Sequence, residues 1–134
     1  MKRSRGVTIY GTYALVVGSL NGAGNLALAV MVAKMGEASA ISPLRPLLGA
    51  LIGALMVAAG IGAFLLRPWG RTLAMAAAVA ILAMTAINLG QIPAGEPARR
   101  IGFIAGYVVF PAALNGGILW FFTRPAVIAQ FRRS

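Results

Sequence analysis

The sequence predicts an all-α integral membrane protein, a four-helix bundle with both termini in the cytoplasm and a short C-terminal interfacial helix. Three observations support this fold class. The chain contains four long apolar runs without charge, its basic residues stand in the gaps between those runs, and only 10% of its 134 residues are charged. Soluble domains carry about 25% charged residues, so the composition argues against a water-soluble fold.

We expect a single transmembrane domain, because a spanning helix needs about 20 apolar residues and four runs reach that length. The predicted helices and the tail cover about residues 7–33, 46–66, 72–92, 101–123 and 124–134. Outer-membrane strands are short and alternate in polarity, whereas these runs are unbroken and rich in Ala and Leu. The basic start before the first run is similar to a signal peptide. That run is long enough to span by itself, so we expect it to remain as a cytoplasmic anchor.

The basic residues also predict the orientation in the membrane. With four spans, both termini and the loop between the second and third helices lie on one side. That side holds Lys2, Arg3, Arg5, Arg67, Arg71, Arg124, Arg132 and Arg133, whereas the opposite side holds Lys34, Arg45, Arg99 and Arg100. Positive residues in short loops favour the cytoplasm, so the first side should be inside. Both acids, Glu37 and Glu96, fall in the outer loops, where a local ion pair is worth about 0–1 kcal/mol.

The stretch FLLRPWGRTLA, between the second and third apolar runs, predicts a tight cytoplasmic turn. Pro68 cannot continue a helix, and we expect Gly70 to let the chain reverse. Trp69 prefers the membrane interface, and Arg67 and Arg71 can reach lipid phosphates while their stems stay in apolar surroundings. We therefore predict that Arg67, Trp69 and Arg71 anchor the turn to headgroups. A role of the two arginines in binding an anion or a partner stays open.

The tail predicts a short helix in the cytoplasmic interface. Val127, Ile128 and Phe131 would share one face of that helix, with Gln130 directed away from it. The basic residues of the tail complete the predicted headgroup anchors: Arg124, Arg132 and Arg133.

Four asparagines within the apolar runs are the candidate functional residues of the membrane interior: Asn21, Asn25, Asn88 and Asn115. Asn21 and Asn25 are four positions apart and therefore share a helix face. An amide in hydrocarbon needs a hydrogen-bond partner, so these side chains either join helices or line a small polar pathway. Both interpretations remain open at this stage.

Proline and glycine add two local expectations. Pro111 should kink the fourth helix and free the carbonyl of Tyr107, one turn earlier. Broken helices often mark binding sites in transporters, but proline is also common in ordinary spanning helices. Spacings of four residues between glycines let helix backbones approach closely, either within the chain or between copies. They occur at Gly18/Gly22, Gly49/Gly53 and Gly102/Gly106.

The turn and the tail resemble those of small, uncharacterised bacterial inner-membrane proteins with four helices. Their turn reads Arg/Lys-Pro-Trp-Ala-Arg-Arg, and their tail often reads Thr-Arg-Pro-x-Val-x-x-x-Phe. The matching positions are Arg67, Pro68, Trp69, Arg71, Thr123, Arg124, Pro125, Val127 and Phe131. The sequence departs at Gly70 and Thr72, where that pattern has Ala and Arg. The resemblance implies a multi-pass protein of the bacterial inner (plasma) membrane, and it implies no activity.

The residue inventory excludes several kinds of chemistry. The chain has no cysteine and no histidine, so it lacks thiolate ligands and the commonest metal and haem ligand. We therefore predict no metal and no cofactor. No ionisable group lies inside a predicted span, which argues against proton pumping. Hydroxyls, arginines and two loop glutamates supply no evident acid–base pair, so we predict that the protein is not an enzyme.

The charge of the sequence indicates which partners to expect. The net charge of +10 is carried by residues next to the membrane, so we expect anionic headgroups as partners and no nucleic acid. The leading hypothesis is an accessory or structural subunit of a larger membrane complex, of respiratory or photosynthetic type, that packs against other subunits or itself. The alternative is a small oligomeric channel or carrier for a neutral or anionic solute.

Overall fold

The computed structural model describes residues 4–36, 42–90 and 96–132. Arg133 and the side chain of Asn88 lie outside this description, so the predictions on them stay untested. Within the described residues the chain is helical and contains no strand. This confirms the all-α prediction, and four helical stretches are long and apolar enough to cross a membrane.

The helices follow one another with short connections. They are α1 (Arg5–Met35), α2 (Leu44–Phe64), α3 (Pro68–Leu89), α4 (Pro97–Ile104), the π-helix η2 (Ala105–Val109), α5 (Phe110–Thr123) and α6 (Pro125–Arg132). Helix α3 begins four residues earlier than predicted, because Pro68 starts the helix rather than only ending the previous one. Proline suits the first helical position, where its missing N–H has no intrahelical partner to lose.

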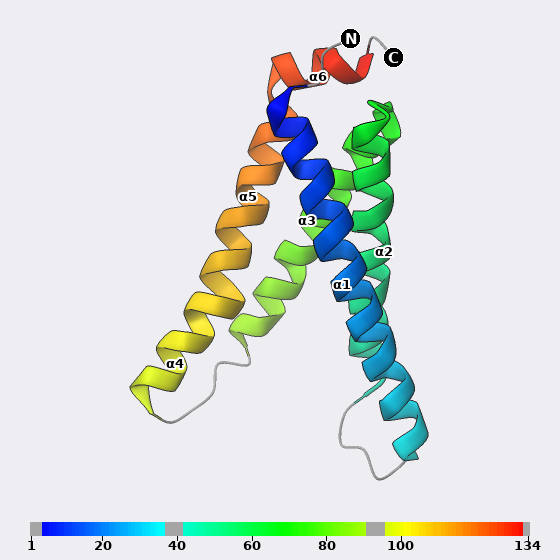
Figure 1. Ribbon diagram of the computed structural model, residues 1–134. Helices are drawn as coiled ribbons and strands as arrows, with labels where there is room; N and C mark the ends of the chain where they lie inside the picture. The colour runs from blue at the N-terminus through cyan, green and yellow to red at the C-terminus, as the bar shows by residue number, and fades with distance from the viewer. Residues whose placement is uncertain (1–3, 37–41, 91–95, 133–134) are drawn as a thin grey trace.

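The four spans form an open arrangement rather than a closed bundle. Helix α1 packs mainly on α2, α2 on α3, and α3 on α5. The start of α1, the turn between α2 and α3, and α6 gather at one end of the molecule (Figure 1). Toward the opposite end, α4 and the far half of α1 diverge (Figure 1).

The hydrophobic core lies at the end that holds the termini. It is built from Val7, Tyr10, Ala14, Ala59, Ala63, Leu66, Ala74, Phe122, Val127 and Phe131. The Tyr10 and Phe122 rings meet edge to face, with centroids 4.7 Å apart. The tail forms the predicted short helix, and Val127 and Phe131 on its apolar face are buried in this core. Its location in the cytoplasmic interface stays a prediction. The Ser4 N–H also donates to Gln130 Oε1 over 3.1 Å, which joins the two ends of the chain.

The turn between α2 and α3 is made differently from the sequence prediction. Leu66 adopts a left-handed conformation with φ 54°. The Leu66 N–H donates to the Ala63 carbonyl over 3.1 Å, and the Arg67 N–H donates to the Gly62 carbonyl over 2.9 Å. These two bonds are the Schellman pattern of a helix C-terminus. Gly70, expected to reverse the chain, instead lies in α3, where a Cβ would come within 2.5 Å of the Gly62 Cα.

The fourth span changes its helix type next to Pro111. Residues Ala105–Val109 form a π-helix, and the Phe110 N–H donates to the Ala105 carbonyl five residues earlier. A proline has no N–H to donate, and its ring collides with the carbonyl four residues before it. The wider turn next to Pro111 accommodates both effects. The predicted irregularity at Pro111 is therefore present, as a π-helical segment.

Candidate functional site

Glycines bring α1 and α2 into backbone contact at the level of the asparagines. A Cβ on Gly53 would lie 2.5 Å from the Gly22 Cα and 2.8 Å from the Gly18 carbonyl oxygen. Each distance is too short for a real side chain. The Gly18/Gly22 and Gly49/Gly53 spacings therefore pack helices within this chain.

Asn21 and Asn25 use this close contact to form a ladder of hydrogen bonds. Asn21 Nδ2 donates to the Gly49 carbonyl of α2 over 3.3 Å. Asn25 Nδ2 donates to both the Asn21 carbonyl and Asn21 Oδ1, each over 2.9 Å. The Asn25 amide occupies the space beside Gly49, since a Cβ there would lie 2.9 Å from Asn25 Nδ2. The ladder joins α1 to α2, as the interpretation of interhelical glue predicts.

The same two asparagines also line a hollow of about 330 Å³. Arg45 reaches this hollow from the first turn of α2, Thr85 from α3, and Tyr107 from the π-helix. The Thr85 hydroxyl donates to the Ile81 carbonyl of its own helix over 2.8 Å. All four spans thus contribute polar groups to this hollow, which we call the polar hollow.

Asn21 and Asn115 line a second hollow, of about 210 Å³, next to the first. Asn21 and Pro111 belong to both hollows. Asn115 is only 3% exposed, and its Nδ2 donates to the Pro111 carbonyl over 2.8 Å. This bond stays within one helix, so it does not join Asn115 to another helix. Among the described residues, no buried side-chain nitrogen or oxygen lacks a partner.

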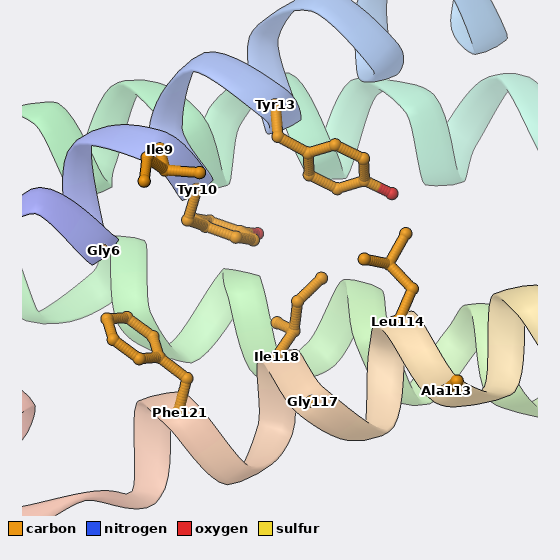
Figure 2. Close-up of a pocket in the computed structure, with 9 residues that line it drawn as sticks. All are labelled: Gly6, Ile9, Tyr10, Tyr13, Ala113, Leu114, Gly117, Ile118 and Phe121. Carbon is orange, nitrogen blue, oxygen red and sulfur yellow. The ribbon is translucent and has the colours of Figure 1, made fainter.

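A third hollow, apolar and of about 380 Å³, lies nearer the end of the molecule that holds the termini. Tyr10 and Tyr13 project from α1, and Leu114, Ile118 and Phe121 project from α5, into the space between the two helices (Figure 2). Tyr13 and Leu114 also line the 210 Å³ hollow. The three hollows therefore form one groove on the α1–α5 side, which we call the lateral groove.

The predicted headgroup anchors of the turn differ from one another in environment. The side chains of Arg67 and Trp69 are exposed at the end of the molecule that holds the termini. Arg71 is half-buried, and its Nε donates to the Phe122 carbonyl over 2.9 Å. Arg71 therefore has an internal structural role in addition to any contact with lipid.

The anchors of the tail lie beside the same surface. The Arg124 guanidinium lies 3.5 Å from the ring centre of the exposed Trp120, which is the geometry of a cation–π contact. Arg132 is exposed in the last turn of α6, where a positive charge favours the helix dipole. Headgroup binding by these residues stays a prediction.

Sequence reasoning missed Arg45 and Tyr107 as residues of the polar hollow. Arg45 had been counted only as a base in an outer loop. A signal was present, since Pro43 and Pro46 flank Arg45 and prolines are common around the first turn of a helix. A helix that begins at Leu44 places Arg45 one turn before Gly49, next to the asparagine ladder.

The structure also shows why an alanine does not fit at position 70. An alanine at position 70 would place its Cβ against Gly62, so α2 and α3 would have to separate. No protein-family model, curated protein or solved structure matches this chain. The resemblance therefore remains a prediction.

Proposed function

We propose that this chain is a non-catalytic accessory subunit of a larger membrane complex in the bacterial inner membrane, and that a helix of another subunit packs along α4, η2 and α5. The observation that supports this is how little of the fourth span the chain covers by itself. In the most apolar stretch of Pro97–Thr123 only 6% of the residues are buried, compared with 33% of the residues in the corresponding stretch of α2. The described residues of α4 and η2 include none that is buried.

The exposed face of this span suits another helix. It includes exposed glycines, which admit a close backbone. They are Gly102, Gly106 and Gly116. A Cβ on Gly102, Gly106 or Gly116 would meet nothing within 4 Å. Unlike the glycines between α1 and α2, these three serve no contact with the described part of the chain.

The asparagines favour a structural role over a pathway. A pathway would present amide groups to a solute, whereas the amides of Asn21, Asn25 and Asn115 donate to carbonyls or to one another. A small oligomeric channel or carrier is the second candidate function. What favours it is that Asn21 lines two adjoining hollows and shares one of them with Asn115.

The test is purification of the tagged chain in mild detergent, with mass spectrometry of what accompanies it. We expect stoichiometric membrane partners that are lost in Gly106→Leu and Gly116→Leu. Gly24→Leu is the matched control, because a Cβ on Gly24 also meets nothing within 4 Å but stands on α1. A clean homo-oligomer, unchanged by Gly106→Leu, would contradict the subunit proposal and favour the carrier.

A further inference from the structure

Two tyrosine hydroxyls face the third hollow of the lateral groove, the apolar one of about 380 Å³. Tyr10 and Tyr13 project from α1, and both hydroxyls point into the space between α1 and α5 (Figure 2). Only 7% of Tyr10 is exposed, and its ring is held edge to face against the buried Phe122. The core therefore fixes the position of the Tyr10 hydroxyl.

These two hydroxyls have no hydrogen-bond partner in the described part of the chain. No fully enclosed side-chain oxygen of that part lacks a partner, so the Tyr10 hydroxyl must open onto the hollow instead of being sealed in the core. A buried tyrosine hydroxyl usually finds a partner, and hydrocarbon offers none. The hollow thus presents two unused hydrogen-bond donors to the molecule that fills it.

The depth of the hydroxyls in the membrane argues against headgroups as their partners. From Arg5 to Tyr13 the α1 helix rises about 12 Å, at 1.5 Å per residue. The headgroup layer on each side of the hydrocarbon is about 5–7 Å thick. With Arg5 in the headgroup layer, as the predicted topology requires, Tyr13 lies in the hydrocarbon. A partner for its hydroxyl must therefore be soluble in lipid.

The rest of the lining favours a neutral and flat ligand. Apart from the two tyrosines, the described residues that line the hollow are apolar, so none of them balances a charged group. The lining includes the rings of Tyr10, Tyr13 and Phe121, and aromatic rings favour edge-to-face or offset contacts with a further ring. A cavity of about 150 Å³ is enough for benzene. The hollow therefore has room for a substituted ring and the start of an apolar tail.

The hollow also opens toward the membrane. Ile9 and Gly117 line it from the two helices, and both residues are exposed. A Cβ on Gly117 would meet nothing within 4 Å, so the space beside this residue is open. A tail that is longer than the hollow can leave through this opening into the lipid.

We propose that this hollow binds a lipid-soluble quinone, which is a neutral flat ring with carbonyl oxygens and an apolar tail. The ring lies among Tyr10, Tyr13 and Phe121, and its carbonyl oxygens accept hydrogen bonds from the tyrosine hydroxyls. The tail leaves between Ile9 and Gly117. A phospholipid acyl chain would fill the same volume but leave both hydroxyls unpaired, and this difference favours the quinone. The site is formed by one chain and does not depend on another subunit.

The experiment titrates the purified full chain, in mild detergent, with a short-tailed ubiquinone that carries one isoprene unit. Quenching of tryptophan fluorescence measures binding, and infrared difference spectra record the carbonyl stretch of the bound quinone. We expect one quinone per chain and a carbonyl stretch at lower frequency than in the free quinone, because a hydrogen bond weakens the C=O bond.

Variants of the tyrosines test the hydrogen bonds. Tyr10→Phe and Tyr13→Phe keep the rings, and each should weaken binding about fivefold, the usual effect of one hydrogen bond, and reduce the shift of the carbonyl stretch. Tyr107→Phe is the matched control, because Tyr107 is an exposed tyrosine that does not line this hollow. An equal loss of affinity in all three variants would overturn the proposal.

A second pair of variants tests the space with both hydroxyls intact. Gly117→Leu fills the opening and should abolish binding, whereas Gly116→Leu should not, since Gly116 does not line the hollow. A Cβ at either position meets nothing within 4 Å. Equal affinities in the wild type, the tyrosine variants and Gly117→Leu would mean that the quinone only dissolves in the micelle, which would contradict the proposal. A loss in Gly117→Leu alone would assign the hollow to an acyl chain that does not use the hydroxyls.

Discussion

The Arg71 Nε donates to the main-chain carbonyl of Phe122, over 2.9 Å. The bond joins the first turn of α3 to the last turn of α5, where carbonyls have no intrahelical partner and the helix dipole places negative charge. Phe122 itself is fully buried against Tyr10. Arg71 therefore closes the fold at the end of the molecule where its core lies.

Because of this bond, Arg71 should contribute more to stability than Arg67, although both arginines belong to the same turn in the sequence. We expect Arg71→Gln to lower the free energy of unfolding by about 1.5–3 kcal/mol, the usual worth of a hydrogen bond to a charged group. Arg67→Gln should stay within about 0.5 kcal/mol of the wild type, as for other exposed positions. Equilibrium unfolding in detergent measures both. Equal losses of stability in Arg71→Gln and Arg67→Gln would mean that both arginines act through their positive charge and that the bond from Arg71 to Phe122 adds nothing.

The left-handed Leu66 predicts an inverted order of two substitutions. Leu66→Ala and Leu66→Gly both remove a buried side chain, but only alanine keeps the left-handed strain of about 1–2 kcal/mol. The glycine variant should therefore be more stable than the alanine variant by about 1 kcal/mol. At Leu73, inside α3, the ordinary order should hold, with alanine better by about 1 kcal/mol. The same order at both positions would show that Leu66 is not strained.

The contact between Gly62 and Gly70 predicts a penalty for alanine at position 70. Gly70→Ala inserts a Cβ against the Gly62 backbone, and overpacking of this kind costs about 1–3 kcal/mol. Gly24→Ala, with open space around its Cβ, should be neutral or stabilising by up to about 1 kcal/mol. Thermal unfolding of the two variants checks the difference. A stable Gly70→Ala protein would mean that α2 and α3 can separate freely.

The sequence was sufficient to predict the helical class and the four spans, because a spanning helix must be long and apolar. It could not separate the two uses of glycine in the turn, since a left-handed residue and a close helix contact both favour a missing Cβ. The left-handed residue is Leu66, whose side chain lies in the core. Gly70 instead lies at the close contact between α2 and α3.

The sequence also could not show which helix faces meet. Lipid tails are as apolar as leucine, so no hydrophobic force between helices distinguishes a protein-facing side from a lipid-facing one. Arg45 and Tyr107 line the same hollow although they are 62 positions apart in the sequence. Such neighbourhoods depend on contacts between distant residues, such as Tyr10 with Phe122.

The position of the chain ends predicts the result of a topology experiment. The start of α1 and α6 lie together, with Ser4 bonded to Gln130, and eight of the twelve bases of the sequence belong to the N-terminus, the tail or the turn between α2 and α3. Positive loops favour the cytoplasm. A reporter fused after Ser134 should therefore report the cytoplasm, and one inserted after Gly36 should report the opposite side. Reporters on the same side would contradict the arrangement of four spans.

Substitutions in the asparagine ladder distinguish a structural role of the asparagines from a role in a solute pathway. Because Asn25 donates to Asn21, and Asn21 to Gly49, Asn21→Ala and Asn25→Ala should each destabilise the protein slightly. Bonds between membrane helices average about 0.6 kcal/mol and reach about 1.7. In a double-mutant cycle we expect a coupling of about that average between Asn21 and Asn25.

Asn115 supplies the control for that cycle, since it bonds to Pro111 of its own helix. Asn21→Ala and Asn115→Ala should add within about 0.3–0.5 kcal/mol, as independent sites do, although both residues line one hollow. If the two asparagines instead act together on a solute, their variants would leave the stability unchanged and abolish a flux into liposomes that carry the protein. That outcome would replace the structural role with a carrier, because only a shared solute would couple residues that do not bond to each other.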